Sequence, residues 1–197
     1  MHSVAILAGG KATRFGGRDK SALLVDGRTI LDRQMSELSS LTGDILIVGG
    51  PDADPAARTI VDLVPGCGPL GGLHAALTEA RGDVVFVVAC DMPYVTARFA
   101  AHLLSLASDA EIVVPQTERG YHPLCAVYAR TCLEMVARRL AERRLKMVDL
   151  FADVRTRGVT SEDIDRFGDR HRLLANVNTP EEYAGLEALH SHKLYPQ

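Results

Sequence analysis

The chain has 197 residues, of which 47% are hydrophobic and 24% are charged, and its formal net charge is −3. This composition is typical of a globular protein of one domain, and the weak negative charge argues against nucleic acid or an anionic membrane surface as a partner. No stretch reaches the roughly 18 consecutive apolar residues of a membrane-spanning helix, and the amino terminus lacks the pattern of a secretion signal. We therefore expect a cytoplasmic protein with no membrane partner.

Apolar runs and amphipathic segments alternate along most of the chain. The strand candidates are nearly continuous runs of Val, Ile, Ala and Leu, as expected of strands covered on both faces: Val4–Leu7, Asp44–Val48, Val84–Ala89, Ile112–Val114 and Cys125–Tyr128. The helix candidates are Thr29–Ser40, Gly72–Ala80, Thr96–Ala107, Arg130–Glu142 and Pro180–Leu189. This order predicts an α/β protein with a doubly wound, mostly parallel, Rossmann-like sheet.

We expect one domain over residues 1–190 and a short C-terminal tail over residues 191–197. The segment Arg155–Arg170 is polar and poorly periodic, and we assign it to no element. Since ligands of open α/β sheets bind beyond the carboxyl ends of the strands, the site is expected in the loops after Leu7, Val48, Ala89, Val114 and Tyr128 and in the segment 176–179.

The first of these loops is rich in glycine and carries cations. Ala8-Gly9-Gly10 follows the strand that ends at Leu7, and Arg14 and Lys20 come further along. Glycines let backbone N–H groups approach phosphate oxygens, and the cations supply charge. The spacing fits neither the dinucleotide fingerprint nor the P-loop. The loop therefore predicts a nucleotide site of a third kind.

A second glycine-rich segment, Gly68-Pro69-Leu70-Gly71-Gly72, leads into a predicted helix. The segment fits two roles: a backbone wrapped around a nucleotide base or ribose, and a tight turn. The tight turn is the commoner role of such clusters. A third feature is Asp91, which follows a buried strand. An ionised carboxylate at that edge needs a partner, and beside a phosphate loop we favour Mg²⁺ over a simple turn.

Polar residues near the carboxyl terminus form a fourth feature. Asn176 and Asn178 lie two apart, so on an extended segment they share one face, and Thr179 with Glu182 begins a helix as a capping box. Two amides there suit a metal, a phosphate or a pterin-like ring, or plain turn chemistry. The basic run 138–146 is a solvated helix face or a contact for an anionic second substrate.

His122 is a candidate acid or base, although a structural histidine is the commoner case. The cysteines show no metal or disulfide spacing, and we expect buried, reduced thiols. No nucleophile is paired with a base. The cysteines are Cys67, Cys90, Cys125 and Cys132.

Taken together, these segments resemble the molybdenum cofactor guanylyltransferases, within the larger nucleotidyltransferase family of glycosyltransferase-A-like fold. The match runs in family order over nearly the whole chain, and its last segment is the one that narrows the family. The matching residues are Leu7-Ala8-Gly9-Gly10, Arg14, Gly16-Gly17, Asp19-Lys20, Gly68-Pro69-Leu70-Gly71-Gly72, Cys90-Asp91-Met92-Pro93, His122-Pro123-Leu124 and Asn176-Val177-Asn178-Thr179-Pro180-Glu181-Glu182.

The resemblance implies an enzyme that transfers GMP from GTP to the phosphate of molybdopterin, with Mg²⁺ as cofactor and with molybdoenzymes or their chaperones as potential partners. It implies catalytic roles for Arg14, Lys20 and Asp91, with Asp91 as the metal ligand. The residues it assigns to GTP are Leu7, Ala8, Gly9, Gly10, Lys20, Asp62, Gly68, Pro69, Leu70 and Asp91. Asn176, Asn178 and His122 are the candidates for the acceptor side.

Three alternatives stay open. The Gly9-Gly10 pair is typical of the guanine-selective branch, but a cytidylyltransferase acting on the same cofactor and a sugar-phosphate nucleotidyltransferase are close siblings. A nucleotide-binding module without catalysis is the alternative from another class, and the presence of Arg14, Lys20 and Asp91 argues against it.

Overall fold

A central sheet flanked by helices organises the protein. The computed structural model describes residues 1–9, 24–50, 55–177 and 182, and the statements that follow concern these residues. The strands are β1 His2–Leu7, β2 Leu24–Val25, β3 Arg28–Thr29, β4 Ile45–Val48, β5 Ala57–Ile60, β6 Val84–Ala89, β7 Ile112–Thr117, β8 Gly120–Tyr121, β9 Cys125–Ala129 and β10 Thr156–Val159. The α-helices are α1 Ile30–Leu38, α2 Gly68–Glu79, α3 Ala97–Ser105, α4 Leu133–Ala141, α5 Ser161–Asp165 and α6 Arg170–Leu173, with 3₁₀ turns at Arg130–Cys132 and Met147–Ala152.

The sheet is mixed and mostly parallel. Its strand order is β10-β7-β9-β6-β1-β4-β5, with β8 paired to β7, while β2 and β3 form a separate hairpin. Strand β1 pairs in parallel with both β4 and β6, and β10 pairs in parallel with β7. Strand β9 runs antiparallel to its neighbours β6 and β7. The predicted α/β class and the mostly parallel sheet are confirmed.

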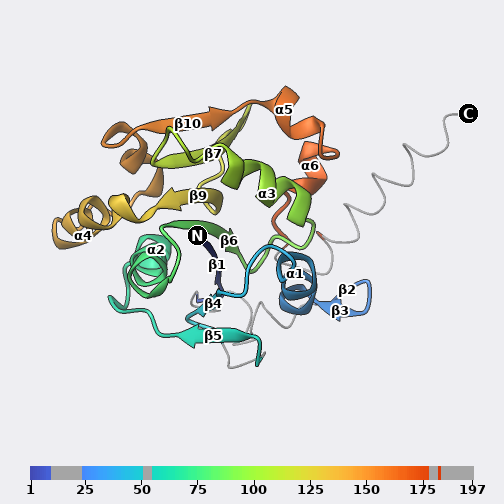
Figure 1. Ribbon diagram of the computed structural model, residues 1–197, viewed down its shortest axis with the longest axis horizontal. Helices are drawn as coiled ribbons and strands as arrows, with labels where there is room; N and C mark the ends of the chain where they lie inside the picture. The colour runs from blue at the N-terminus through green and yellow to red at the C-terminus, as the bar shows by residue number, and fades with distance from the viewer. Residues whose placement is uncertain (10–23, 51–54, 178–181, 183–197) are drawn as a thin grey trace, which may run out of the picture.

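Helices cover both faces of the sheet, and each face carries a large hydrophobic core (Figure 1). On one face Leu31 and Met35 of α1 and Phe99 of α3 pack against strand residues such as Phe86. On the other face α2 and α4 pack together and onto the sheet through residues such as Leu73. Strand side chains buried alternately on two covered faces explain why β1, β4 and β6 are apolar almost throughout.

Several predicted helices are confirmed, with ends that differ from the predicted ones. Helices α1 and α3 begin after Thr29 and Thr96, whose hydroxyls accept hydrogen bonds from backbone N–H groups as N-caps. Helix α2 begins at Gly68, four residues before the predicted start, because Pro69 is tolerated in a first helical turn. The glycine-rich segment is therefore the start of a helix.

The loop after Tyr128 does not lie at the ligand edge, contrary to the sequence prediction. A parallel connection needs a crossover of about a dozen residues or more, and the short excursion through β8 instead returns β9 antiparallel to β7. The end of β9 consequently lies at the amino-terminal edge, where Arg130 N donates to Asp83 O at 2.8 Å. The residues before β9 lie at the carboxyl edge, where Ala89 N donates to Leu124 O at 2.9 Å.

The segment Arg155–Arg170 supplies an edge strand and part of a helical excursion. It contains β10, the short helix α5 and the turn that enters α6. The predicted helix Pro180–Leu189 and the tail 191–197 lie outside the described residues, apart from Glu182. None of the described helices combines the length and the apolarity that crossing a lipid bilayer needs.

A buried carboxylate fastens the amino-terminal edge of the sheet. Asp44 is 2% exposed and accepts hydrogen bonds from Ser3 Oγ at 2.6 Å, Arg81 N at 2.8 Å and Arg58 Nη2 at 2.8 Å. Burial by itself raises the pKa of Asp44, but these hydrogen bonds and the charge of Arg58 outweigh it and hold the pKa below its ordinary value. The cluster ties β1, β4 and β5 together, far from the ligand edge.

Candidate active site

The end of β1 supplies the first wall of the site. Ala8 N and Gly9 N both donate to Val48 O, at 2.9 and 3.0 Å, so the chain leaves β1 pressed against the end of β4. Gly49 has φ +70°, and a Cβ on it would lie 2.9 Å from Gly9 Cα. Only glycine fits there without displacing the loop. The N–H groups of Ala8 and Gly9 are therefore both used inside the fold.

The start of α2 supplies the second wall. Asp62 Oδ1 accepts a hydrogen bond from Val64 N at 3.0 Å, and a Cβ on Gly71 would come within 2.9 Å of the same oxygen. Gly71 thus lets the Asp62 carboxylate lie against the first turns of α2. Gly68 and Pro69 are exposed, whereas Leu70 is fully buried, so any contact of Leu70 with a nucleotide comes from its backbone.

Asp91 follows β6 at the same edge and is joined to the carboxyl-terminal segment. Asn176 Nδ2 donates to Asp91 Oδ1 at 2.9 Å, and Val177 N donates to Asp91 O at 2.7 Å. Cys90 N donates to Leu7 O at 3.1 Å, which fixes the Asp91 loop to the end of β1. Two segments that the sequence analysis treated separately therefore meet in one place.

Gln34 holds the Asp91 loop from α1. This side chain is 1% exposed, and its Nε2 donates to Ala89 O at 2.8 Å and to Met92 O at 3.0 Å, on either side of Asp91. The sequence analysis did not single out Gln34. The signal was present, because Leu31, Met35 and Leu38 define the apolar face of α1 and position 34 falls on that face.

A cavity of about 540 Å³ opens beside Asn176. His122 and Arg119, from the β7–β9 connection, lie on one side of it, and Arg170 and His171 of α6 line the other. Glu118 is within ion-pair distance of Arg170 (3.6 Å) and of His171 (3.9 Å). His122 and Asn176, both sequence candidates for the acceptor side, line this one cavity.

His122 is suited to hydrogen bonding at neutral pH. Its Nε2 lies 2.9 Å from Thr117 Oγ1. Burial lowers the pKa of His122 below its ordinary value, and the charge of Arg119 lowers it further against the opposing effect of Glu118. With a neutral imidazole, the charged side chains of the lining are Arg119 and Arg170 together with Glu118 and Glu182.

The basic run 138–146 does not line this cavity. Arg139 is 1% exposed and forms an ion pair with Asp153 at 2.5 Å, so it fastens α4 to the following turn. Arg143 Nη1 lies 3.6 Å from Cys67 Sγ, at the start of α2. The idea that this run serves the acceptor side thus finds no support among the contacts of the described residues.

The cysteines are buried free thiols, as expected. Burial raises the pKa of Cys125 and of Cys132 to about 12, so neither is a nucleophile at neutral pH. Four further candidates of the sequence analysis, Gly10, Arg14, Lys20 and Asn178, lie outside the described residues.

The donor set at Asp91 fits a hard divalent cation. Within the described residues no three His, Cys, Asp or Glu side chains gather into a metal cluster. One carboxylate with a neighbouring amide oxygen is nevertheless the kind of incomplete protein shell that Mg²⁺ adopts when substrate phosphates and water complete the coordination. Asp91 is the carboxylate at this edge, and the neighbouring Asn176 contacts it through the amide nitrogen.

A mostly parallel α/β sheet with a carboxylate and an amide joined at its carboxyl edge fits the ligand-binding arrangement of open α/β sheets. Residues 4–155 match the family model described as the MobA-like NTP transferase domain, and the chain therefore belongs to that family.

Named relatives agree with this assignment. The chain is 34% identical over 187 residues to a molybdenum cofactor guanylyltransferase of Desulfosudis oleivorans, covering 93% of each chain. It is 32% identical to a probable molybdenum cofactor guanylyltransferase of Pelotomaculum thermopropionicum, over 90% of this chain and 87% of the relative. Its fold matches molybdopterin-guanine dinucleotide biosynthesis protein A from Archaeoglobus fulgidus with a TM-score of 0.81 and 24% identity, over 97% of this chain and 99% of that one.

Proposed function

We propose that this protein transfers GMP from GTP to the terminal phosphate of molybdopterin, with release of pyrophosphate. The observation that carries the proposal is the contact between Asp91 and Asn176. This contact supports the proposal because Asn176 also lines the cavity that contains His122, so the carboxylate that we propose as the metal ligand is a neighbour of that cavity. A site with a nucleotide wall on one side and a polar cavity lined by two arginines and two glutamates on the other suits a reaction that joins two phosphorylated substrates.

The nucleotide side favours guanine by hydrogen-bond polarity. The Watson–Crick edge of guanine carries N–H donors, and the carbonyl groups of Ala8 and Gly9 are acceptors that β4 does not use. Asp62 at the start of α2 is a further acceptor within this wall. We assign Arg14 and Lys20 to the triphosphate, because cations on a glycine-rich loop are what phosphate binding requires.

The acceptor side has the volume and the hydrogen-bonding groups for a phosphorylated heterocycle. The cavity of about 540 Å³ lies within the roughly 300–1,000 Å³ of small-molecule sites. Arg119 and Arg170 suit a phosphate, while neutral His122 and the amide of Asn176 suit the hydrogen-bonding groups of a pterin. Asn178 shares the face of Asn176 if the segment continues extended, and it stays a candidate for the same side.

The chemistry needs positioning and charge neutralisation more than proton transfer. An oxygen of the molybdopterin phosphate attacks the α-phosphorus of GTP, the bond to the bridging oxygen breaks, and pyrophosphate leaves with the electron pair. The attacking phosphate is already anionic, so no strong base is required. Asp91 would hold Mg²⁺, and the bound ion would supply positive charge near the phosphates. Gln34 and Asn176 fix the Asp91 carboxylate, and Arg14 and Lys20 neutralise the leaving group.

Turnover by wild-type protein and by Asp91→Asn tests the proposal. Pyrophosphate release is measured with molybdopterin and each of GTP and CTP. The wild type is expected to release pyrophosphate with GTP, and Asp91→Asn is expected to keep its melting temperature while losing most of the rate. Preference for CTP identifies the cytidylyltransferase sibling, and binding without release identifies a non-catalytic module. A folded Asp91→Asn that turns over at the wild-type rate with saturating Mg²⁺ contradicts the metal assignment.

A further inference from the structure

Thr117 and His122 form a hydrogen-bonded pair in the lining of the cavity that contains Asn176. Strand β7 ends at Thr117, and the short strand β8 leads back to His122, so the β7–β8 turn brings the two side chains together. Thr117 Oγ1 lies 2.9 Å from His122 Nε2. The sequence analysis named His122 as a candidate for the acceptor side but did not name its partner.

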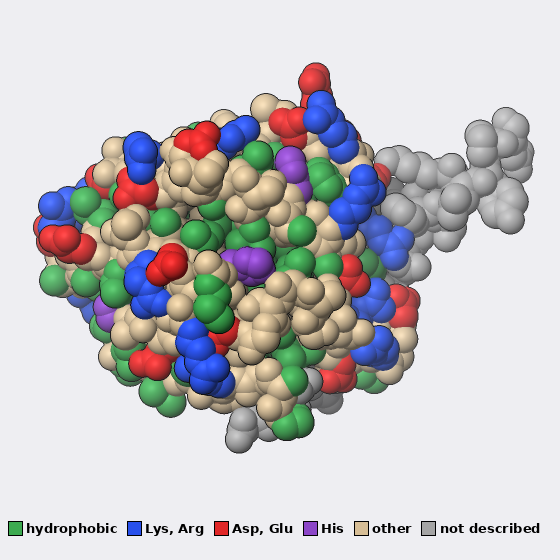
Figure 2. All heavy atoms as spheres, viewed as in Figure 1, with side chains coloured by type: hydrophobic (Ala, Val, Ile, Leu, Met, Phe, Trp, Pro, Cys, Tyr) green, Lys and Arg blue, Asp and Glu red, His purple; other side chains and the backbone are tan. Residues whose placement is uncertain are grey.

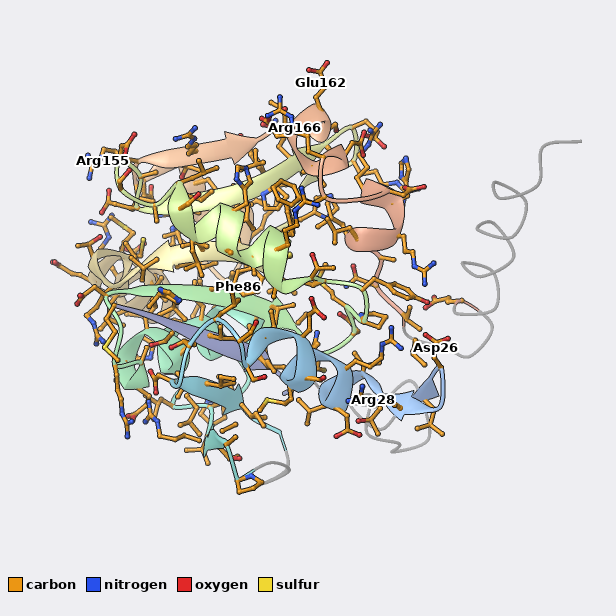
Figure 3. The ribbon with its side chains drawn as sticks, turned by 45° about the vertical axis from the view of Figure 1, so that its right-hand side comes forward. Asp26, Arg28, Phe86, Arg155, Glu162 and Arg166 are labelled. Atoms are coloured by element: carbon orange, nitrogen blue, oxygen red, sulfur yellow. The ribbon has the colours of Figure 1, made fainter. Side chains whose placement is uncertain are left out.

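The pair lies where α6 comes close to the end of β7. Strand β10 pairs in parallel with β7, so both strands end at the carboxyl edge of the sheet, and the chain continues from β10 into α5 and α6. Figure 3 shows this path: β10 runs from the labelled Arg155 toward the labelled Glu162 and Arg166, and α6 follows. The cavity therefore lies between the turn after β7 and α6, which contributes Arg170 and His171.

The arginines and the carboxylates of this lining are equal in number. The arginines are Arg119 and Arg170, and the carboxylates are Glu118 and Glu182. Figure 2 likewise shows acidic and basic side chains mixed along the edge of the molecule that carries α5 and α6. Because the formal charges balance, the hydrogen-bond polarity of neutral groups such as His122 gains weight in deciding which ligand atoms fit the cavity.

A second hydrogen bond sets the direction of the bond between Thr117 and His122. Arg119 N donates to Thr117 Oγ1 at 3.3 Å, so this oxygen already serves as an acceptor in the β7–β8 turn. Among the described residues, the acceptor within reach of the Thr117 hydroxyl proton is His122 Nε2. A hydroxyl carries one proton, and leaving that proton unpaired forfeits a hydrogen bond. The hydroxyl therefore donates and Nε2 accepts.

An accepting Nε2 determines which tautomer His122 adopts. A neutral imidazole carries its proton on one ring nitrogen only, and the other nitrogen is the acceptor. When Nε2 accepts, the proton is on Nδ1, to which the described part of the chain offers no hydrogen-bond partner. His122 is only half-buried and lines the cavity, so the Nδ1–H group is the donor that this ring can offer to a ligand.

We propose that Thr117 is a positioning residue for the acceptor side: it holds His122 as the Nδ1–H tautomer, so that the ring donates a hydrogen bond to an oxygen atom of the bound acceptor. The identity of that acceptor rests on the proposed function, whereas the tautomer follows from the hydrogen bonds of the protein alone. Phosphate and carbonyl oxygens both accept such a bond. A ligand that presents an N–H group at the same place loses it, so Thr117 contributes to specificity through His122.

Nitrogen-15 NMR of protein labelled in histidine tests the tautomer directly, because protonated and unprotonated ring nitrogens resonate far apart. Spectra are recorded at about pH 8, above the ordinary histidine pKa of about 6.5, so that the neutral imidazole predominates. His122→Gln identifies the resonances of His122 among the seven histidines. The wild type is expected to carry the proton of this ring on Nδ1.

Three threonine variants show whether the Thr117 hydroxyl is responsible. Thr117→Val removes the hydroxyl, and it is expected to lose the Nδ1–H tautomer and to raise the KM for molybdopterin about tenfold, as for a lost hydrogen bond to a charged oxygen, with the KM for GTP nearly unchanged. Thr117→Ser keeps the hydroxyl and is expected to retain the tautomer and both KM values. Thr131→Val, which removes a hydroxyl bound to Glu111 away from the cavity, is the matched control and is expected to behave as the wild type does.

Addition of molybdopterin is expected to shift the Nδ1 resonance of the wild type, a measurement that needs no turnover. The same shift with inorganic phosphate alone identifies a phosphate oxygen as the partner of Nδ1–H, and its absence with phosphate identifies an oxygen of the pterin. The proposal is overturned if the wild-type proton is on Nε2, if Thr117→Val keeps the wild-type tautomer, or if molybdopterin leaves the Nδ1 resonance unmoved. Product formed from GTP while that resonance stays unmoved overturns this proposal alone, whereas a tautomer that Thr117 controls, without any product, counts against the proposed function.

Discussion

Replacing Gln34 with methionine tests how the Asp91 loop is supported. Gln34 Nε2 donates to the carbonyl oxygens of Ala89 and Met92, at 2.8 and 3.0 Å, from a side chain that is 1% exposed. Methionine keeps the length and the helix propensity of glutamine but removes both donors. The change therefore removes the support and leaves the packing of α1 nearly intact.

The expected loss of stability is about 1–3 kcal/mol. Each of the two hydrogen bonds makes a net contribution of about 0.5–1.5 kcal/mol to the free energy of unfolding, and the carbonyl oxygens left without a donor add to the loss. The opposing effect comes from Gln34 Oε1, which is buried without a hydrogen-bond partner in the described structure and disappears in the variant. For a chain of this length the melting temperature is expected to fall by about 2–12 °C.

Activity is expected to fall because the Asp91 loop loses the hydrogen bonds from Gln34. Since Asp91 lies between the two carbonyl groups that Gln34 holds, the variant is expected to need more Mg²⁺ and to lose about tenfold in kcat, with a smaller change in the KM for GTP. Calorimetric melting and steady-state kinetics at several Mg²⁺ concentrations measure both effects. Gln116→Met, at an exposed position, is the matched control. A Gln34→Met protein that melts and turns over like the wild type refutes this reasoning.

Three further substitutions test other parts of the structure. Asn176→Ala removes the 2.9 Å hydrogen bond to the Asp91 carboxylate. The value of kcat/KM is expected to fall about 10- to 100-fold, as for a lost hydrogen bond to a charged group. If kcat/KM and the Mg²⁺ concentration needed for activity both stay within threefold of the wild type, the metal role is contradicted. Asp44→Asn is expected to cost about 2–4 kcal/mol at pH 7. Folding lowers the pKa of Asp44, so its stabilisation is complete above the pKa of the unfolded chain, about 3.9, and is lost as the pH falls toward the folded value. The free energy of unfolding of the variant, measured by urea denaturation, is therefore expected to fall less steeply with decreasing pH than that of the wild type. An equal dependence on pH in both proteins contradicts the assignment. Gly49→Ala is expected to lose both stability and GTP affinity. The control Gly27→Ala, with a similar φ of +74° and nothing within 4 Å of its Cβ, is expected to lose only about 1 kcal/mol of stability. Equal GTP affinity in the two variants would show that the approach of Gly49 to Gly9 is unimportant.

Buried strands and capped helices were predictable from the sequence, and edge strands were not. The apolar runs of β1, β4 and β6 reflect burial on both faces, and Thr29 and Thr96 mark helix starts by a local interaction. Strand β5 reads Ala-Arg-Thr-Ile and β10 reads Thr-Arg-Gly-Val, and within the described part of the chain each is an end strand of the sheet. An edge strand is held chiefly by backbone hydrogen bonds, which leave no hydrophobic signature.

The direction of β9 was not readable from composition. A central strand is apolar whether it runs parallel or antiparallel, and what decides its direction is the short connection before it. Within the site, sequence reasoning identified Asp91 and Asn176 separately, since each follows an element at the ligand edge. It did not find the pairing of Thr117 with His122, because that contact depends on the β7–β8 turn, which only the fold shows.

The most direct test of the central claim is to identify the product by mass spectrometry. Purified protein is incubated with molybdopterin, Mg²⁺ and an equimolar mixture of GTP and CTP, with Asn176→Ala as the comparison. The account predicts molybdopterin guanine dinucleotide as the main dinucleotide, one pyrophosphate released for each product formed, and a much slower yield from Asn176→Ala. A cytosine dinucleotide as the main product, or no dinucleotide from protein that binds GTP, would contradict it.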